Sequence, residues 1–413
     1  MVLQSNLHKL CRWTEGVFYQ FMDEKGNLKA SLRHRDQGLV SLCEASHLAK
    51  EGEHATEEAT NFTTKQLKSL MEGSLEPHLV EHVAHALELP LNRRMPGYDQ
   101  WFIEASQREA KMNPVLLELA KLDFNRVQII YQRELREVSR WWSNLGLAQR
   151  LPFSRDRLME NYFWTVGWAF EPQFARFREA QTKGNCLITT IDDVYDVYGT
   201  IDELELFTDA VERWDVNTMD KLPEYMKICF LALFNTTNDT AYNVMKEKGL
   251  DIIPHLKKAW ADLCKAYMVE ARWYHQGYTP NLEEFLENAL VSISGLLILT
   301  LAYCTSDDVS QETLEDFHSC PEIARRSSMI LRLCDDLGTS KDELERGDVP
   351  KSIQCYMHES GLSEYAARKP KKMIAINIPR MAHCMYQYGD GYGKPDGVIE
   401  DRIGSLFIEP ILL

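Results

Sequence analysis

Apolar residues recur along most of this chain with the spacing of an amphipathic helix rather than the alternation of a strand. Between Ser41 and Ala49, for example, one side of a helix would carry Leu42, Ala45, Leu48 and Ala49. Runs of β-branched residues are rare, and from Asn113 onward the helical segments become longer and more apolar. Pro114 suits the first turn of such a helix. The pattern therefore predicts an all-α protein.

The composition limits the classes of function. The chain has 413 residues, enough for two domains, and a net charge of −16 at pH 7. Because this charge repels phosphates, neither nucleic acid nor an anionic membrane is expected as a partner. No window approaches about 18 uninterrupted apolar residues, which argues against a membrane span. The ten cysteines form no C-x-x-C pair and predict reduced, mostly buried thiols.

A cluster of carboxylates follows an apolar run at Asp192, Asp193 and Asp196. On an α-helix Asp192 and Asp196 would lie about 40° apart on one face, and Asp193 would lie just beyond the edge of that face. Carboxylates this close repel one another, and their burial is costly unless protons, basic partners or a metal neutralise them. Oxygen ligands without nearby histidine or cysteine favour Mg²⁺ or Mn²⁺ over zinc. Taken alone, such a motif is more often a solvated acidic helix face.

A second oxygen-rich segment begins at Asp335. Asp335, Thr339 and Glu343 are spaced four residues apart, so a helix would align a carboxylate, a hydroxyl and a carboxylate. Apolar runs precede both segments, which suggests two metal sites facing each other across a pocket. Since Mg²⁺ usually completes its coordination with substrate phosphates, the two segments together predict a diphosphate substrate.

The two segments resemble the metal motifs of class I plant terpene synthases, in the monoterpene synthase branch. The first reads Ile-Asp-Asp-Val-Tyr-Asp-Val-Tyr-Gly-Thr over residues 191–200, and the second Asp-Asp-Leu-Gly-Thr-Ser-Lys-Asp-Glu over residues 335–343. The sequences of residues 207–215 and 346–351 strengthen the match, which covers nearly the whole chain. Chain-elongating prenyltransferases differ because they carry a second Asp-Asp-x-x-Asp.

The resemblance implies a class I terpenoid synthase helical barrel over residues 111–413, preceded by a partial N-terminal α-helical domain over residues 1–110. The front of that domain, with its tandem arginines, has no counterpart in this sequence. Plastid localisation is implied as well, although the chain shows no transit peptide and would be cytoplasmic as encoded. A monomer or weak homodimer is expected.

The family's metal ligands fall on both segments. Three Mg²⁺ or Mn²⁺ ions would be held by Asp192, Asp196, Asp335, Thr339 and Glu343. Asp193 would be a further ligand, or would orient the ligands by pairing with an arginine.

Basic and aromatic residues complete the implied site. The diphosphate would be bound, and kept from the carbocation, by Arg155, Arg157, Arg332 and Lys351. Arg332 lies three residues before Asp335, on the same face of a helix. Trp164 and Tyr386 would line the hydrocarbon cavity, where an aromatic face stabilises a cation by about 0.5 to 2 kcal/mol. Without this context, surface charge and core packing would be the usual interpretations.

The implied function is a Mg²⁺-dependent lyase that ionises an allylic prenyl diphosphate, expected to be geranyl diphosphate, and forms a monoterpene. The small residues at 292–296, with Gly295 among them, predict a break in a long apolar helix. The resemblance implies that this break lies beside the substrate's reacting carbon. One alternative is a sesquiterpene synthase that uses farnesyl diphosphate. The other is an impaired relative that binds metal or diphosphate without turnover. It is motivated by the missing front segment and by an apparent internal deletion near residues 368–373. Pro379 inside the helix that presents Tyr386, and Tyr392 where many relatives carry histidine, further weaken the expectation of activity.

Overall fold

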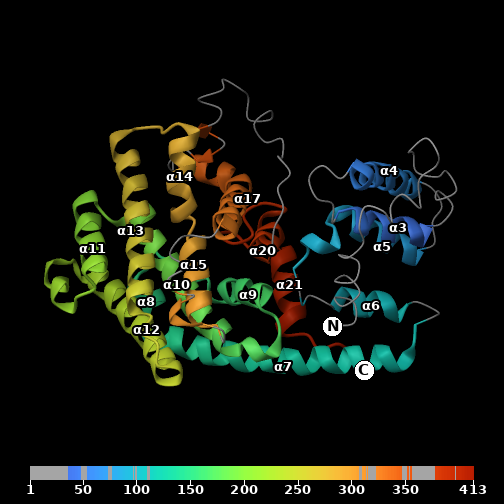
Figure 1. The fold of residues 1–413 in the computed structure, drawn as a ribbon, viewed down its shortest axis with the longest axis horizontal. Coiled ribbons are helices and arrows are strands. Elements are labelled where there is room, and N and C mark those ends of the chain that lie inside the picture. The colour runs from blue at the N-terminus through green and yellow to red at the C-terminus, as the bar shows by residue number, and fades with distance from the viewer. Residues whose placement is uncertain are drawn as a thin grey trace. The chain divides into compact units, whose positions relative to one another are not determined.

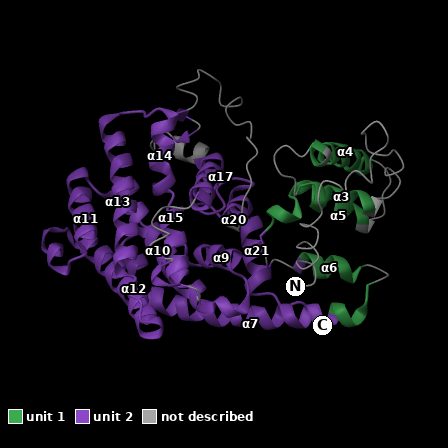
Figure 2. Ribbon diagram, viewed as in Figure 1, with its two compact units in different colours: residues 1–94, 101–117 green, residues 95–100, 118–413 purple. Residues whose placement is uncertain are grey.

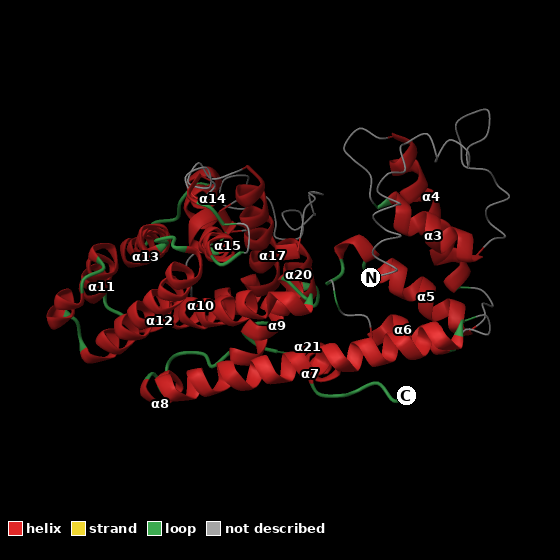
Figure 3. Ribbon diagram, turned by 60° about the horizontal axis from the view of Figure 1, so that its bottom comes forward, coloured by secondary structure: helices red, strands yellow, loops and turns green. Residues whose placement is uncertain are grey.

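The computed structural model describes residues 36–47, 54–72, 77–95, 97, 100–108, 112–306, 309–312, 314, 322–346, 351–352, 354–355, 377–395 and 397–413. Across these residues the backbone is helical or irregular, and none of them forms a strand (Figure 3). The prediction of an all-α protein is therefore confirmed.

Two compact units make up the chain (Figure 2): residues 1–94 with 101–117, and residues 95–100 with 118–413. The smaller unit contains α3 (Asp36–Ser46), α4 (His54–Met71), α5 (Pro77–Glu88), η3 (Leu91–Arg93) and most of α6 (Gln100–Gln107). In this unit Leu39, Leu67 and Val83 join α3, α4 and α5 in one apolar cluster. The domain division predicted at residue 110 stays a prediction.

Long helices build the larger unit (Figure 1). Its first elements are α7 (Pro114–Leu145), whose first turn belongs to the smaller unit, α8 (Leu147–Arg150), α9 (Leu158–Trp168), η4 (Pro172–Phe174), α10 (Ala175–Asp193), η5 (Val194–Tyr198), α11 (Ile201–Arg213), η6 (Val216–Lys221) and α12 (Glu224–Lys248). They are followed by α13 (Ile253–Gln276), α14 (Leu282–Ser292), α15 (Gly295–Cys304), α17 (Glu322–Arg346), α20 (Asn377–Tyr386) and α21 (Gly397–Phe407).

Helix α10 lies between two apolar clusters of the larger unit. It packs on α9, α12 and α15, and α13 in turn packs on α11, α14 and α15. Leu187 belongs to the cluster that also contains Phe207 and Trp260, whereas Ile188 contacts both this cluster and the one around Phe407. Apolar packing on both sides therefore fixes the helix that carries the first carboxylate motif.

A buried ion pair joins α7 to α10. The Arg178 side chain is 0% exposed, and its Nε and Nη2 donate to the Glu134 carboxylate at 2.8 and 2.7 Å. The Tyr162 hydroxyl donates to the same carboxylate, and Nη1 of Arg178 donates to the carbonyl oxygens of Ala169 and Glu171. Because the Glu134 side chain is only 10% exposed, removing its carboxylate would leave the buried Arg178 uncompensated and cost about 3 to 5 kcal/mol.

The most apolar stretch of the described chain is a broken helix. By length and composition alone Leu282–Cys304 could cross a membrane, but half of it is buried inside the protein. Ser294, with a left-handed φ of 64°, separates α14 from α15, so the break predicted at Gly295 is confirmed. A Cβ on Gly295 would lie 2.9 Å from the Cβ of Ser328, so glycine permits α15 to approach α17 closely.

The described residues of helix α20 run without a break from Asn377 through Pro379 to Tyr386. Because residues 371–376 are not described, the prediction that Pro379 weakens or kinks this helix stays a prediction. The apparent deletion near residues 368–373 lies outside the described residues.

Candidate active site

One cavity of about 160 Å³ in the larger unit collects most of the predicted site residues. Its walls come from α9, α10, η5, α13, the α14–α15 break, α17, α20 and the segment that follows α20. The predicted residues that line it are Arg155, Trp164, Asp192, Asp196, Arg332, Asp335, Thr339, Lys351 and Tyr386. Arg157 and Asp193 do not line it, and the Glu343 side chain, on α17, lies outside the described residues.

The sequence pattern predicts one continuous α-helix for the first carboxylate motif, and this prediction is wrong. Helix α10 ends at Asp193 and continues as the π-helical turn η5, in which the Gly199 N–H donates to the Val194 carbonyl at 2.8 Å. Such wider turns often occur at functional sites. Asp192 and Asp196 nevertheless line the same cavity. A Cβ on Gly199 would lie 2.9 Å from the Val194 carbonyl oxygen, so glycine closes this turn.

Arg155 neutralises two carboxylates of this motif. Its Nη2 lies 2.7 Å from Oδ2 of Asp192, and its Nε lies 2.7 Å from Oδ1 of Asp193. The Arg155 backbone N–H also donates to Asp193, which is 2% exposed. Burial raises the pKa of Asp193, and the Arg155 guanidinium opposes the rise. Asp193 thus anchors Arg155, while Asp192 remains 29% exposed and faces the cavity.

A second arginine neutralises the motif on α17. The Arg332 guanidinium forms ion pairs with both Asp335 and Asp336. Asp336, which is 0% exposed, also accepts the Ser352 N–H at 3.1 Å. The Thr339 hydroxyl donates to the Asp335 carbonyl at 2.9 Å and keeps its oxygen on the cavity wall. Each motif therefore pairs an arginine on the cavity wall with its own carboxylates.

The other two basic residues differ in position. The Arg157 guanidinium donates to the carbonyl oxygens of Tyr392 and Gly393, at 2.9 and 2.7 Å, so it holds the segment after α20. Lys351 is 8% exposed and lines the cavity. The structure therefore brings Arg155, Arg332 and Lys351 to the cavity, and Arg157 only to its border.

Aromatic rings form the apolar part of the wall. The ring centroids of Trp164 and Tyr386 lie 6.2 Å apart, and Trp168 and Tyr267 line the same cavity. Burial, followed by the nearby Asp335 carboxylate, raises the pKa of Tyr386. Burial, followed by Asp192, likewise raises the pKa of Tyr267. Both side chains are therefore neutral phenols, which offer an aromatic face and no phenolate charge.

A polar cluster in the cavity escaped the sequence analysis. The Tyr392 hydroxyl donates to Oδ1 of Asn161 at 3.1 Å and contacts the Thr189 hydroxyl. In the sequence, Tyr392 stands out only as a departure from the family pattern, and Asn161 and Thr189 do not stand out. Helical spacing could have found Thr189 and Asn185, because they precede Asp192 by three and seven residues on the same face of α10.

The donor set of the cavity suits a hard divalent cation. Among the described residues, no three histidine, cysteine, aspartate or glutamate side chains already converge on one point. Oxygen atoms of Asp192, Asp196, Asp335 and Thr339 nevertheless line one cavity from two separate helical segments. Mg²⁺ is usually bound by one or two carboxylates together with water and substrate phosphates. The residues therefore fit Mg²⁺ ions whose coordination an anionic ligand completes.

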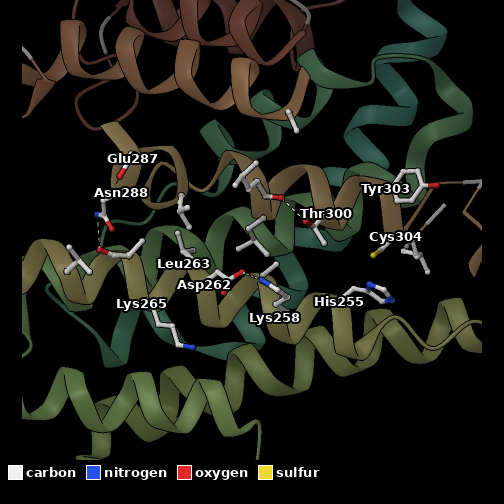
Figure 4. A pocket seen from close by; sticks show the side chains of 18 residues that line it. His255, Lys258, Asp262, Leu263, Lys265, Glu287, Asn288, Thr300, Tyr303 and Cys304 are labelled. Carbon is white, nitrogen blue, oxygen red and sulfur yellow. Dashed lines mark hydrogen bonds and ion pairs between the residues drawn. The ribbon is translucent and has the colours of Figure 1, made fainter. Parts of the chain in front are cut away.

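A second, larger hollow of about 390 Å³ lies against α14 and α15 (Figure 4). Its lining residues come mainly from α13, α14 and α15, and none of the predicted site residues is among them. Size alone would thus point away from the carboxylate motifs, and the chemistry of the lining residues places the candidate site in the smaller cavity.

Two family models match this chain. Residues 143–377 match the metal binding domain of the terpene synthase family, and residues 12–87 match the terpene synthase N-terminal domain. A curated relative, the chloroplastic monoterpene synthase 7 of Hedychium coronarium, is 55% identical over 96% of this chain and 72% of its own length.

Solved structures show the same similarity. Limonene synthase with 2-fluorolinalyl diphosphate superposes with a TM-score of 0.92 at 44% identity, over 97% of this chain and 79% of that one. Isoprene synthase from Populus x canescens, with three Mg²⁺ ions and dimethylallyl-S-thiolodiphosphate, gives a TM-score of 0.90 at 44% identity, over 97% of this chain and 82% of that one.

Proposed function

The chain belongs to the terpene synthase family, whose members are lyases acting on prenyl diphosphates, and we propose that its substrate is geranyl diphosphate and its product a monoterpene. The observation that carries the proposal is the cavity in which Asp192 and Asp196 face Asp335 and Thr339, with aromatic rings on the remaining wall. The carboxylates and the hydroxyl would bind the metal ions that hold the diphosphate, and the rings would contact the hydrocarbon chain of the substrate.

The metal ligands would be Asp192, Asp196, Asp335 and Thr339, with Glu343 retained from the family resemblance. The chemistry supplied by bound Mg²⁺ is the neutralisation of negative charge on the diphosphate as it departs. The isoprene synthase structure, which holds three Mg²⁺ ions and a thiolodiphosphate, supports this assignment. We assign Asp193 the task of orienting Arg155, because it accepts both the backbone N–H and Nε of that residue.

The diphosphate would be bound by Arg155, Arg332 and Lys351, which line the cavity beside the carboxylates. Guanidinium groups suit this task because they bind phosphate oxygens through two parallel hydrogen bonds. Arg157 would contribute indirectly, because its guanidinium holds the segment at Tyr392 and Gly393 against the cavity. Positive charge around the departing group stabilises charge that develops as the C–O bond breaks.

The hydrocarbon end of the substrate would lie against Trp164, Tyr267 and Tyr386. Their faces stabilise a carbocation by about 0.5 to 2 kcal/mol each without reacting with it. The name of the Hedychium relative, a monoterpene synthase, supports a ten-carbon chain over the fifteen carbons of farnesyl diphosphate. Exclusion of water by these rings would decide whether the cation loses a proton or is captured as an alcohol.

The impaired relative is the weaker alternative. The described residues of α20 stay helical past Pro379 up to Tyr386, which lines the cavity. The chloroplastic name of the Hedychium relative supports a plastid location for this chain. A monomer or weak homodimer stays our proposal for its assembly, which light scattering after size exclusion would test.

The direct test is incubation of the purified chain with Mg²⁺ and either geranyl or farnesyl diphosphate, followed by analysis of the volatile products. Monoterpenes from geranyl diphosphate are expected, and Asp192→Asn is the matched inactive control. Product from farnesyl diphosphate alone would overturn the substrate assignment. Diphosphate binding without any product would favour the impaired relative.

A further inference from the structure

The α14–α15 break is a wall shared by two hollows. Ser292, Ile293 and Ser294 line the candidate active-site cavity. Asn288 and Leu296, on either side of the break, line the larger hollow instead, where Figure 4 shows Asn288 beside Glu287 at one end. Any shift of this short segment would therefore change the shape of the cavity in which the cation reacts.

The wall is tied to α13 through one buried carboxylate. Glu270 is 6% exposed, and its Oε1 accepts hydrogen bonds from the Ser292 hydroxyl and from Nδ2 of Asn288, the latter at 3.0 Å. Nδ2 of Asn288 also donates to the Ala266 carbonyl at 3.1 Å. Two consecutive turns of α14 thus bind the same carboxylate on α13, directly before the break between α14 and α15.

The break needs such an anchor because its backbone is strained. Ser294 has a φ of 64°, a left-handed conformation that is unfavourable for a residue with a side chain, and it persists only where the surroundings hold it. Gly295 fixes the other side of the break by its close approach to Ser328 on α17.

We propose that Glu270 is a positioning residue that fixes the α14–α15 break and thereby selects among the products of the carbocation. The inference deepens the proposed function and rests on it. Glu270 does not line the cavity. It acts through Ser292, whose position sets where Ile293 and Ser294 meet the substrate.

Four variants test this role: Glu270→Gln, Glu270→Leu, Ser292→Ala and the double variant Glu270→Leu with Ser292→Ala. The Gln oxygen can still accept both hydrogen bonds, so Glu270→Gln should keep the native ratio of products. Glu270→Leu should change that ratio and lower kcat by roughly ten- to a hundredfold, since small misplacements remote from the chemistry have effects of this size. KM should change little, because the diphosphate-binding residues remain in place. Glu283→Leu, at an exposed carboxylate of α14, is the matched control.

The double variant separates positioning from a direct effect of the Ser292 hydroxyl. If Glu270 acts through Ser292, adding Ser292→Ala to Glu270→Leu changes the product ratio no further. Additive effects, or a native ratio in Glu270→Leu, would overturn the proposal. Should Glu270→Leu fail to fold, Asn288→Leu takes its place, because it removes one donor to Glu270 without touching the active-site cavity. A native ratio in that variant would overturn the proposal equally.

Hydrogen exchange keeps the test independent of the proposed function. Backbone amides of residues 289–297 should exchange faster in Glu270→Leu than in Glu270→Gln, whether or not the protein forms terpenes. If the parent chain makes no product from either diphosphate, the proposed function fails while exchange still decides whether Glu270 holds the break. Equal exchange in the two variants would show that it does not.

Discussion

Nη2 of Arg155 donates to Oδ2 of Asp192 across 2.7 Å, so a residue assigned to the diphosphate neutralises a residue assigned to the metal. Both partners are about one third exposed, which leaves the pair within reach of solvent and ligands. A cation bound to Asp192 would compete with this ion pair, and the Arg155 guanidinium would then be able to face the diphosphate.

Replacing Arg155 by glutamine should therefore strengthen the binding of the metal ion and weaken turnover of the diphosphate substrate. Without substrate, Mn²⁺ should bind several-fold more tightly, because Asp192 has lost its competing partner. Turnover should fall at least about tenfold, since a diphosphate-binding group is gone. Titration followed by electron paramagnetic resonance measures the first effect and steady-state kinetics the second. Arg150→Gln, at an exposed position of α8, is the control, and unchanged metal affinity in Arg155→Gln would contradict the competition.

Removing either lining carboxylate of the first motif should nearly abolish turnover. Asp192→Asn or Asp196→Asn is expected to lower kcat at least about a hundredfold, or close to 3 kcal/mol of barrier, because each removes a charged metal ligand of similar size. Asp202→Asn, at an exposed carboxylate in the first turn of α11, should behave like the parent chain. Turnover within tenfold of the parent in both variants would show that these residues bind no catalytic metal.

The oxygen-only donor set makes a prediction about ion selectivity. Activity should require Mg²⁺ or Mn²⁺, vanish in EDTA and return when either ion is added back, whereas zinc should not restore it specifically. Product formation after exhaustive chelation, measured by gas chromatography, is the decisive observation. Full activity under those conditions would exclude the proposed role of the carboxylates.

In the smaller unit, burial raises the pKa of Glu44 to about 7, opposed by the Leu91 N–H and Arg94. A raised carboxyl pKa contributes stability that is fully present below the unfolded value of about 4.5 and is lost as the pH rises through about 7. Glu44→Gln, whose oxygen can still accept the Leu91 N–H, should stabilise α3 and α5 by about 1 to 3 kcal/mol near pH 8 and by little near pH 5. Native-state hydrogen exchange of those helices, compared with the parent at each pH, measures the difference. An equal effect at both values would mean that titration of Glu44 is not its cause.

Gly295→Ala should destabilise the larger unit, because the added Cβ would lie 2.9 Å from the Cβ and 3.1 Å from the Cα of Ser328. Overpacking of this kind costs about 1 to 3 kcal/mol. Gly404→Ala is the matched control: it lies within α21, its Cβ would meet open space, and it should stabilise by up to about 1 kcal/mol. Thermal unfolding of the two variants compares the effects, and equal midpoints would show that α15 can move away from α17.

The sequence alone predicted the local features of this protein. Helical periodicity gave the all-α fold, and the spacing of Asp192 and Asp196, with that of Asp335 and Thr339, placed each pair on one wall of the cavity. These inferences succeed because helix formation and the alignment of residues three or four apart depend on neighbours in the chain. The break at Ser294 was likewise visible as a cluster of small residues.

Tertiary packing decided where the side chains point. Asp193 turns to Arg155, which lies 38 residues away, and Arg157 holds the carbonyl of Tyr392, 235 residues away. Nor could periodicity show that Glu270 anchors Ser292, or that α10 widens into a π-turn at η5. Such contacts depend on which distant helices pack together. Periodicity shows which face of a helix a side chain occupies, whereas packing decides whether that side chain contacts a metal ligand, an arginine or a carbonyl.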